Sequence, residues 1–273
     1  MCYAYRDDAF EELLLSHLIG VGSCCKERWE LGALSSKISR ALKLSLDGVR
    51  SAILLSSLLH DLGKAAQMFQ ERCSQGRCTE FYGHYLISAF LMHLALNTAG
   101  VLVEGRDVSN FIEDRLDDID RDKIIGILTI LPIAFHHYHQ VEGFRSYSLR
   151  DSLRNFVEKP KIWGRCMDDL DLLTKSISTY MLSSTLSKAV ANLPSTLSNL
   201  ERPRDSGFYE LYRGSRLFIE NFYHNIVERG VRLMAVTLSG VIIESITGLV
   251  NLCDGYVAYR ARSRAGGKNG RNI

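Results

Sequence analysis

Apolar residues recur at helical spacing along most of this chain. Phe10, Leu14 and Leu18, for example, share one face of an expected helix. No series of segments with alternating apolar and polar residues indicates a β-sheet. We expect helices over residues 8–21, 29–41, 45–72, 82–97, 108–117, 121–139, 165–190, 208–229 and 231–262. The pattern therefore predicts an all-α fold, a helical bundle.

Three stretches with proline should interrupt this pattern. Pro132 must kink its helix or restart it as a first-turn residue, because proline lacks the backbone N–H that a helix interior needs. Pro160 marks a break over residues 157–164. Residues 192–207 hold Pro194 and Pro203 among serines and asparagines, so this stretch is expected to be the clearest loop.

The composition is that of an ordinary globular domain, with 46% apolar and 23% charged residues. A chain of 273 residues can bury a sizeable core without a structural metal, so any metal is expected to be catalytic. The formal net charge of +2 says little about partners. Residues 1–264 are expected to form one domain, followed by a basic flexible tail at 265–273. That tail is solvated or touches nucleic acid or an acidic partner.

The cysteines and the apolar segments indicate a compartment. The seven cysteines form no CxxC pair, and their odd number favours buried thiols in a reducing compartment, although Cys73 and Cys78 could cross-link. Acidic residues near the start do not fit a secretory signal. The most apolar stretch, residues 233–243, is shorter than the roughly 20 residues that cross a bilayer. We expect a soluble, cytoplasmic protein without a membrane partner.

The pair His60-Asp61 is the first chemical signal. It lies among leucines, so at least one of the two side chains should be buried, which is costly without a partner. A divalent cation is the strongest partner, although a core histidine paired with a carboxylate explains the pair equally well on its own. Lys64 should lie on the same side one turn later, where its charge would suit a phosphate held over the metal.

The doublet His136-His137 favours the metal, because two adjacent imidazoles within an apolar helix are hard to explain as packing. His17 and His84 are ordinary core histidines when each is taken alone. Asp254 lies among apolar residues and needs a partner. Three further histidines are expected to be non-ligands: His93, His139 and His224.

Together these residues resemble the HD superfamily of metal-dependent phosphohydrolases: an early histidine, a His-Asp doublet, further histidines and a late aspartate. The sequence Gly-His-Tyr around His84 and the doublet His136-His137 are most similar to the CRISPR-associated HD nucleases of type I interference. The chain has no P-loop signature, so it resembles the stand-alone nuclease subunit that works with a separate helicase and the CRISPR effector complex. Residues 165–240 resemble nothing that we can name.

The resemblance implies an HD-domain helical bundle and a two-metal site. One ion would be held by His17, His60, Asp61 and Asp254, and the other by Asp61, His84, His136 and His137. Asp61 would bridge the ions as the central catalytic residue, and Lys64 would steady the scissile phosphate. Imidazole-rich ligands favour Mn, Fe, Co or Ni, with Mg possible. The family implies cleavage of single-stranded DNA, and often RNA.

Basic and aromatic residues near the doublet fit a single-stranded substrate. Lys64, Arg145 and Arg150 are expected to bind its phosphates, and Tyr138, Phe144 and Tyr147 could stack on its bases.

Two alternatives stay open. One is a phosphohydrolase of nucleotides or cyclic nucleotides, which a closed pocket would favour over an open basic groove. The other is a catalytically weak HD module that binds a partner.

Overall fold

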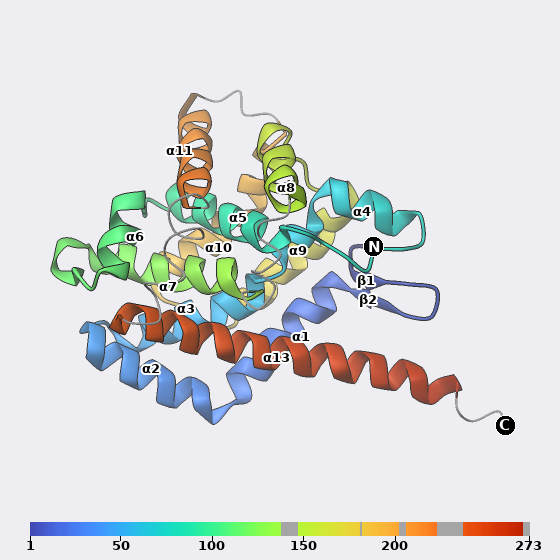
Figure 1. The fold of residues 1–273 in the computed structure, drawn as a ribbon, viewed down its shortest axis with the longest axis horizontal. Coiled ribbons are helices and arrows are strands. Elements are labelled where there is room, and N and C mark those ends of the chain that lie inside the picture. The colour runs from blue at the N-terminus through green and yellow to red at the C-terminus, as the bar shows by residue number, and fades with distance from the viewer. Residues whose placement is uncertain (138–146, 181, 202–205, 223–236, 270–273) are drawn as a thin grey trace.

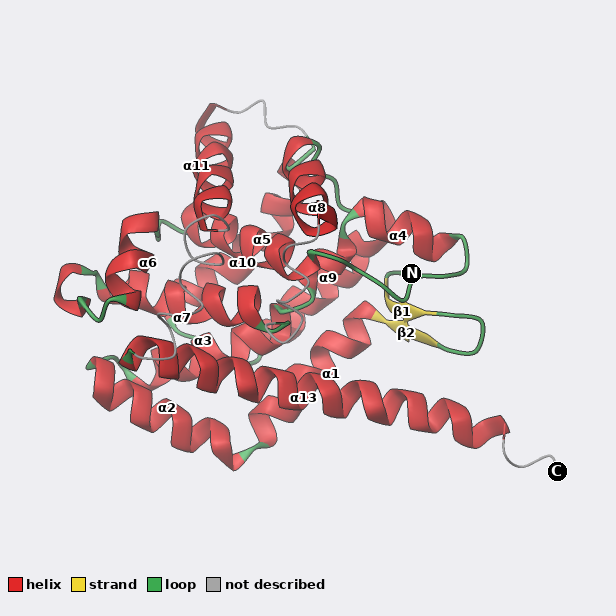
Figure 2. Cartoon of the chain, viewed as in Figure 1, coloured by secondary structure: helices red, strands yellow, loops and turns green. Residues whose placement is uncertain are grey.

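A computed structural model describes residues 1–137, 147–180, 182–201, 206–222 and 237–269. Its helices confirm the all-α prediction (Figure 2). They are α1 (Leu14–Glu27), α2 (Trp29–Leu42), α3 (Leu46–Leu59), the short η1 (Leu62–Ala65), α4 (Gln67–Ser74), α5 (His84–Thr98), α6 (Gly105–Ile112), the short η2 (Leu116–Asp118), α7 (Arg121–Phe135), α8 (Tyr147–Glu158), α9 (Gly164–Ser178), α10 (Ser184–Asn199), α11 (Ser206–Phe222) and α13 (Leu238–Asn269).

The first segment differs from the helix expected over residues 8–21. Strands β1 (Tyr3–Arg6) and β2 (Glu11–Leu13) form an antiparallel hairpin, and the helix begins only at Leu14. The Asp7 carboxylate accepts the backbone N–H groups of Ala9 and Phe10, which holds the turn between the strands. This local hydrogen bonding to an aspartate is a turn signal that competes with a helix.

Helix α5 is the centre of the bundle. Every residue from His84 to Asn97 is buried, as expected of a helix that other elements cover on all sides. Helices α7, α10 and α11 pack against it together with η1. Helix α3 packs on α7, α1 and α2, and the long α13 crosses α1 and α7 (Figure 1).

The helix expected over residues 45–72 is three elements. Helix α3 ends at Leu59, η1 follows at Leu62, and α4 begins at Gln67. Gly63 lies against α5 and donates its N–H to the Ser88 hydroxyl at 2.7 Å. A Cβ on Gly63 would lie 2.1 Å from the His84 carbonyl oxygen, so this contact requires glycine. The break places His60 and Asp61 where the chain leaves a helix.

The loop expected over residues 192–207 was wrong for its first half, because α10 continues to Asn199 with Pro194 inside it. The buried residues recur at three- and four-residue spacing and pack on α5: Leu186, Ala189, Val190, Leu193 and Leu197. Burial of this stripe outweighs the lost hydrogen bond of one proline. The helix expected over 165–190 is likewise divided, because α9 ends at Ser178 and α10 begins at Ser184.

Pro132 lies inside α7 and does not restart it. A proline there frees the carbonyl four residues earlier, at Leu128. The Ser56 hydroxyl of α3 lies 3.4 Å from this oxygen and 3.0 Å from that of Thr129. The neighbouring helix thus supplies polar contact where the proline removes it.

Helix α13 differs from its prediction at its end. It runs to Asn269, so residues 265–269 of the expected tail are helical. Its part Leu238–Arg264 is, within the described chain, the one helix long and apolar enough to span a membrane. This is weak evidence, because core helices of soluble proteins pass the same test and 39% of the apolar window is buried in the fold.

Six of the seven cysteines form disulfides, contrary to the expected buried thiols. The pairs are Cys2–Cys166, Cys24–Cys253 and Cys73–Cys78, with Cα–Cα separations of 4.9, 5.6 and 4.7 Å. Cys25 is free and buried, and burial raises the pKa of its thiol to about 11. Spacing could not show the two long-range pairs, because each joins segments that only the fold brings together.

The contact at Gly63 gives a stability prediction. Gly63→Ala should lower the free energy of unfolding by about 3 kcal/mol, because the added Cβ overlaps backbone atoms of α5 that cannot rotate away. Gly32→Ala is the matched control: a Cβ at this exposed position of α2 meets nothing within 4 Å and should raise stability by about 0.5–1 kcal/mol. Urea unfolding followed by circular dichroism measures both, and equal stability of the two variants would contradict the close packing of η1 on α5.

Candidate metal centre

Three of the candidate histidines lie at helix ends. His60 caps the C-terminal end of α3, His84 is the first residue of α5, and His136 follows the last residue of α7. His136 and His137 were expected inside a helix reaching 139, but α7 ends at Phe135. At the C-terminal ends of α3 and α7, backbone carbonyls lack a helical N–H partner and can accept a side-chain hydrogen bond.

Each of these imidazoles is fixed by the carbonyl three residues before it. His60 Nδ1 lies 2.9 Å from the Ser57 oxygen, and His136 Nδ1 lies 2.7 Å from the Ile133 oxygen. His84 Nδ1 makes the same contact to the Phe81 oxygen. A carbonyl oxygen only accepts, so Nδ1 carries the proton and donates in all three. The lone pair of each Nε2 is therefore directed into the site.

His17 is fixed by a carboxylate instead. Its Nδ1 lies 2.9 Å from Glu12 Oε1, and both side chains are buried. Glu12 belongs to β2, and His17 lies one turn into α1. A carboxylate behind an imidazole orients the ring and raises its basicity as a ligand, the common outer contact of metal-bound histidines.

The first cluster gathers four residues from three parts of the chain. His17 Nε2 lies 3.1 Å from Asp254 Oδ1 and 3.4 Å from Asp61 Oδ2. His60 Nε2 lies 3.5 Å from the same Asp61 oxygen and 3.8 Å from Asp254 Oδ1. One ligand atom from each residue falls within 4.8 Å of the others, as a shared ion requires.

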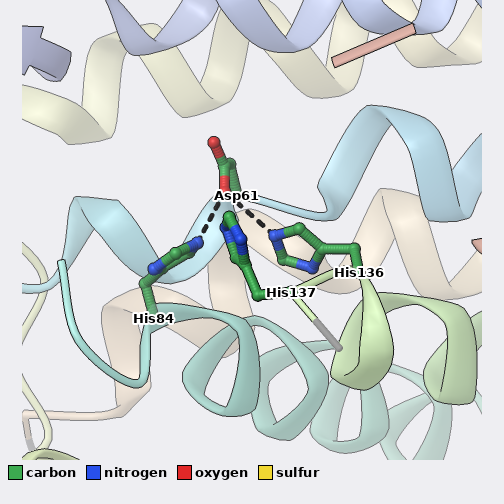
Figure 3. Close-up of side chains that lie close together, drawn as sticks. All are labelled: Asp61, His84, His136 and His137. Carbon is green, nitrogen blue, oxygen red and sulfur yellow. Dashed lines mark ion pairs between the residues drawn. The ribbon is translucent and has the colours of Figure 1, made fainter. Parts of the chain in front are cut away.

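The second cluster uses the other oxygen of Asp61 (Figure 3). His84 Nε2 lies 2.8 Å from Asp61 Oδ1, and His136 Nε2 lies 3.3 Å from it. His137 completes the group, with its ring between those of His84 and His136 in the view of Figure 3. All seven expected ligands are therefore brought together, with Asp61 in both clusters.

The polar atoms of the site fit a cation. The atoms Nε2 of His17, His60, His84 and His136 and Oδ1 of Asp61 are buried without a hydrogen-bond partner. Buried polar groups are nearly always satisfied, so this concentration of donor atoms fits a site that holds a metal ion. Imidazole nitrogens and carboxylate oxygens suit divalent transition metals. The chain thus has two His/Asp clusters suitable for metal ions, whose identity the donor set leaves open.

Burial and charge set the protonation of these groups. Burial lowers the pKa of His136 to about 4 and that of His137 to about 2, so both rings are neutral at pH 7, the form that can bind a metal ion. Burial also lowers the pKa of His84. Burial alone would raise the pKa of Asp61, but Lys64, His60 and His84 outweigh it and hold that pKa well below its usual range.

The groups around His17 shift each other in opposite directions. Burial alone would lower the pKa of His17, but the close carboxylates of Asp254, Asp61 and Glu12 raise it well above its ordinary value. Burial alone would raise the pKa of Asp254, yet hydrogen bonds from His17 and His60 lower it. Asp254 is the most exposed of the four side chains, at 25%. It is therefore the member of the first cluster that solvent reaches.

Lys64 lies beside Asp61, as the sequence indicated, although on η1 and not on a continuous helix. Its Nζ lies 2.6 Å from Asp61 Oδ2 and 5.1 Å from the centre of the Phe81 ring. Its side chain is 14% exposed, so the ammonium group is at the edge of the site. Contact with a phosphate remains a prediction.

Several expected residues fall outside what can be described. Arg145, Tyr138 and Phe144 lie outside the described residues, as do His139 and His224, and the side chains of Arg150 and Tyr147 in α8 are not described either. His93 is apart from the site: its Nε2 donates to the Val103 carbonyl at 2.8 Å, and its Nδ1 lies 2.9 Å from the Ser215 hydroxyl. This matches a satisfied core histidine, whose pKa burial lowers to about 4.

Sequence reasoning missed Glu12. Its position five residues before His17 is not a helical spacing, and the expected helix over 8–21 hid the hairpin that brings the two together. No motif signals such a contact. The carbonyls that hold the other rings carry no sequence signal at all, since they are backbone atoms.

One family comparison gives a match. Residues 5–98 match the family model described as "Cas3, HD domain". The chain carries a Cas3 HD domain. Over residues 5–98 this is a CRISPR-associated HD nuclease domain, as the resemblance predicted, and the match implies a CRISPR interference context. No curated protein and no solved structure matches this chain.

The matched region contains only part of the site. His17, His60, Asp61 and His84 lie within residues 5–98, whereas the doublet His136-His137 and Asp254 lie beyond it. The fold brings these later residues onto the Cas3 HD framework through α7 and α13.

Two hollows differ in their relation to the clusters. One, of about 800 Å³, lies between α8 and α11 and contains none of the cluster residues. The other, of about 580 Å³, is a groove between the hairpin, α1 and α13 that has His17 in its wall. The second hollow therefore adjoins the first His/Asp cluster, although it is the smaller of the two.

The contact of Glu12 with His17 gives a prediction on metal binding. Glu12→Ala should weaken Mn²⁺ binding about 10–100-fold, because His17 loses the group that fixes its ring and tautomer. Glu12→Gln keeps an acceptor oxygen and should recover part of the affinity. Isothermal titration with Mn²⁺ measures this, with Glu11→Ala as the control from the same strand. Unchanged affinity in Glu12→Ala would show that His17 is not oriented through this carboxylate.

Proposed function

We propose that this Cas3 HD domain is a two-metal nuclease that hydrolyses phosphodiester bonds of single-stranded DNA. The observation that carries the proposal is the division of Asp61: its two oxygens face two separate groups of imidazoles. When two divalent ions are bound there, they supply an activated water and stabilise the leaving oxygen of an in-line displacement.

The side chains prepare the site for that chemistry. His17, His60, Asp61 and Asp254 would hold one ion, and Asp61, His84, His136 and His137 the other. Hydrogen bonds donated by Nδ1 fix the rings of His17, His60, His84 and His136, so little reorganisation is needed when metal ions bind. Such nitrogen-rich groups favour Mn, Fe, Co or Ni over Mg, whose preferred ligands are oxygens.

Lys64 supplies the positive charge at the edge of the site. It pairs with Asp61, and we propose that it also steadies the scissile phosphate as negative charge develops there. Lys64 would then act on the substrate while leaving the ligands in place.

An open groove beside His17 supports a polymeric substrate over a nucleotide, which would fit a closed pocket better. RNA cleavage is a part of the same proposal. A helicase and the CRISPR effector complex are the proposed partners, because a single strand must be supplied to such a site. A cytoplasmic location is also part of the proposal.

Asp61→Ala should abolish metal-dependent cleavage of labelled single-stranded DNA, because it removes the ligand that both clusters share. Metal content, measured by mass spectrometry, should fall for both ions. His137→Ala should remove mainly one of the two ions. The control is Asp168→Ala, which changes an exposed carboxylate in α9. Full cleavage by Asp61→Ala would contradict the two-metal proposal. If the metal-loaded protein cleaves no single-stranded substrate, a small-nucleotide substrate is favoured instead.

Lys64→Ala should separate turnover from metal binding. We expect turnover to fall about 100-fold, as for the loss of one charged transition-state contact. Metal affinity should stay equal or rise, because the ammonium group 2.6 Å from Asp61 Oδ2 competes with a cation for that oxygen. Single-turnover cleavage and Mn²⁺ titration measure the two effects, with the exposed Lys37→Ala as control. Weakened metal binding with unchanged turnover would show that Lys64 positions the metal-binding residues and does not act on the substrate.

A further inference from the structure

The groove beside His17 is bounded by two different walls. The hairpin and α1 form one wall, with Phe10, Glu12 and His17. The other wall is the last part of α13, with Tyr256, Arg260 and Arg264. Because His17 belongs to both the first metal cluster and this wall, the groove adjoins the candidate active site.

The α13 wall combines exposed rings with cations. Tyr256 is 46% exposed, so its ring is open to a ligand in the groove. The guanidinium of Arg260 lies 5.5 Å from the centre of the Tyr256 ring, and that of Arg262 lies 4.9 Å from the centre of the Tyr5 ring. These pairs offer flat surfaces on which a base can stack, next to positive charge.

The spacing of these residues gives the wall a direction. Tyr256, Arg260 and Arg264 are four residues apart, so they lie along one line of α13 with steps of about 6 Å. This part of α13 passes the hairpin and extends beyond the body of the bundle (Figure 1). A ligand along the line would therefore reach from outside the bundle to the wall that contains His17.

The acidic residues of the groove do not neutralise the arginines along α13. Glu11 is paired with Arg6 at 2.7 Å, and Glu12 is buried against His17. Glu27 lies at the other end of α1, beyond Cys24. After Asp254 the chain has no acidic residue. A strand with phosphates is thus favoured at the α13 wall, whereas an uncharged or cationic ligand is not.

We propose that the groove between the hairpin and the last turns of α13 binds the incoming single strand, with Arg260 and Arg264 on its phosphates and Tyr256 under a base. The proposal rests on the proposed nuclease function and assigns the path by which the substrate reaches the first metal cluster. These phosphate-binding residues are not the ones expected from the sequence near His136-His137.

The test measures binding apart from cleavage. Fluorescence anisotropy of a labelled oligothymidylate is followed in the Asp61→Ala background, where the strand stays intact. Adding Arg260→Gln and Arg264→Gln together should weaken binding at least about tenfold and reduce the slope of log K against log salt by about 1.4, since each single-strand phosphate contact contributes about 0.7. Tyr256→Ala should weaken binding about tenfold with an unchanged slope.

A matched control and a second substrate separate this proposal from the nuclease proposal. Arg106→Gln changes an arginine of α6 that is 77% exposed and lies near the other end of α13, so binding should stay as it was. With Asp61 intact, the groove variants should hydrolyse bis-p-nitrophenyl phosphate at the normal rate, because this diester is too small to need the groove. Groove variants that bind oligothymidylate normally would overturn the groove assignment alone.

Other outcomes are equally informative. Failure of the unaltered chain to hydrolyse either substrate with any metal would overturn the nuclease proposal, while loss of DNA binding in the groove variants would still support the groove. Oligoglutamate that displaces oligothymidylate at equal charge concentration would overturn the strand assignment in favour of an acidic protein partner.

Discussion

The buried carboxylate of Asp61 is the group on which this structure depends. A charge at 2% exposure is costly unless other groups compensate, and four imidazoles and one ammonium group lie within 3.5 Å of its two oxygens. Burial lowers the pKa of His84 and His136, so these two imidazoles are not cations that balance the charge. Lys64 pairs with one oxygen of Asp61, and both oxygens also belong to clusters that could hold a metal ion.

Three of the four imidazoles around this carboxylate come from helix ends. The rings of His60 and His136 leave their helices at the last turn, and that of His84 leaves at the first. Each ring donates to a carbonyl, so the backbone that ends a helix also fixes the tautomer of a ligand. Gly63 makes this possible, because η1 can approach α5 only where there is no side chain. The close packing of η1 on α5 thus sets the distance between His84 and Asp61.

The chain's apolar periodicity predicted the helices and, with the resemblance, the set of residues that the fold gathers. It could not show where helices end within apolar runs: residues 45–72 read as one helix, since the break depends on a contact with α5. At Pro194 the opposite happened: the proline predicted a loop, but burial of the apolar face of α10 kept the segment helical. Glu12 and the pairs Cys2–Cys166 and Cys24–Cys253 were not predictable, since no local pattern encodes contacts between distant segments.

Asp254 shows how a ligand late in the chain can be positioned as well as an early one. The Asp114 carboxylate accepts the N–H groups of Leu238 and Ser239, which fixes the start of α13 on the bundle. Further along, Cys253 is joined to Cys24, and Val257 lies against Gly20, where a Cβ would be 3.1 Å from the valine. These contacts flank Asp254 on both sides and hold α13 against α1, which carries His17. The same helix then continues past the hairpin, so the element that closes the first metal cluster also forms one wall of the groove leading to it.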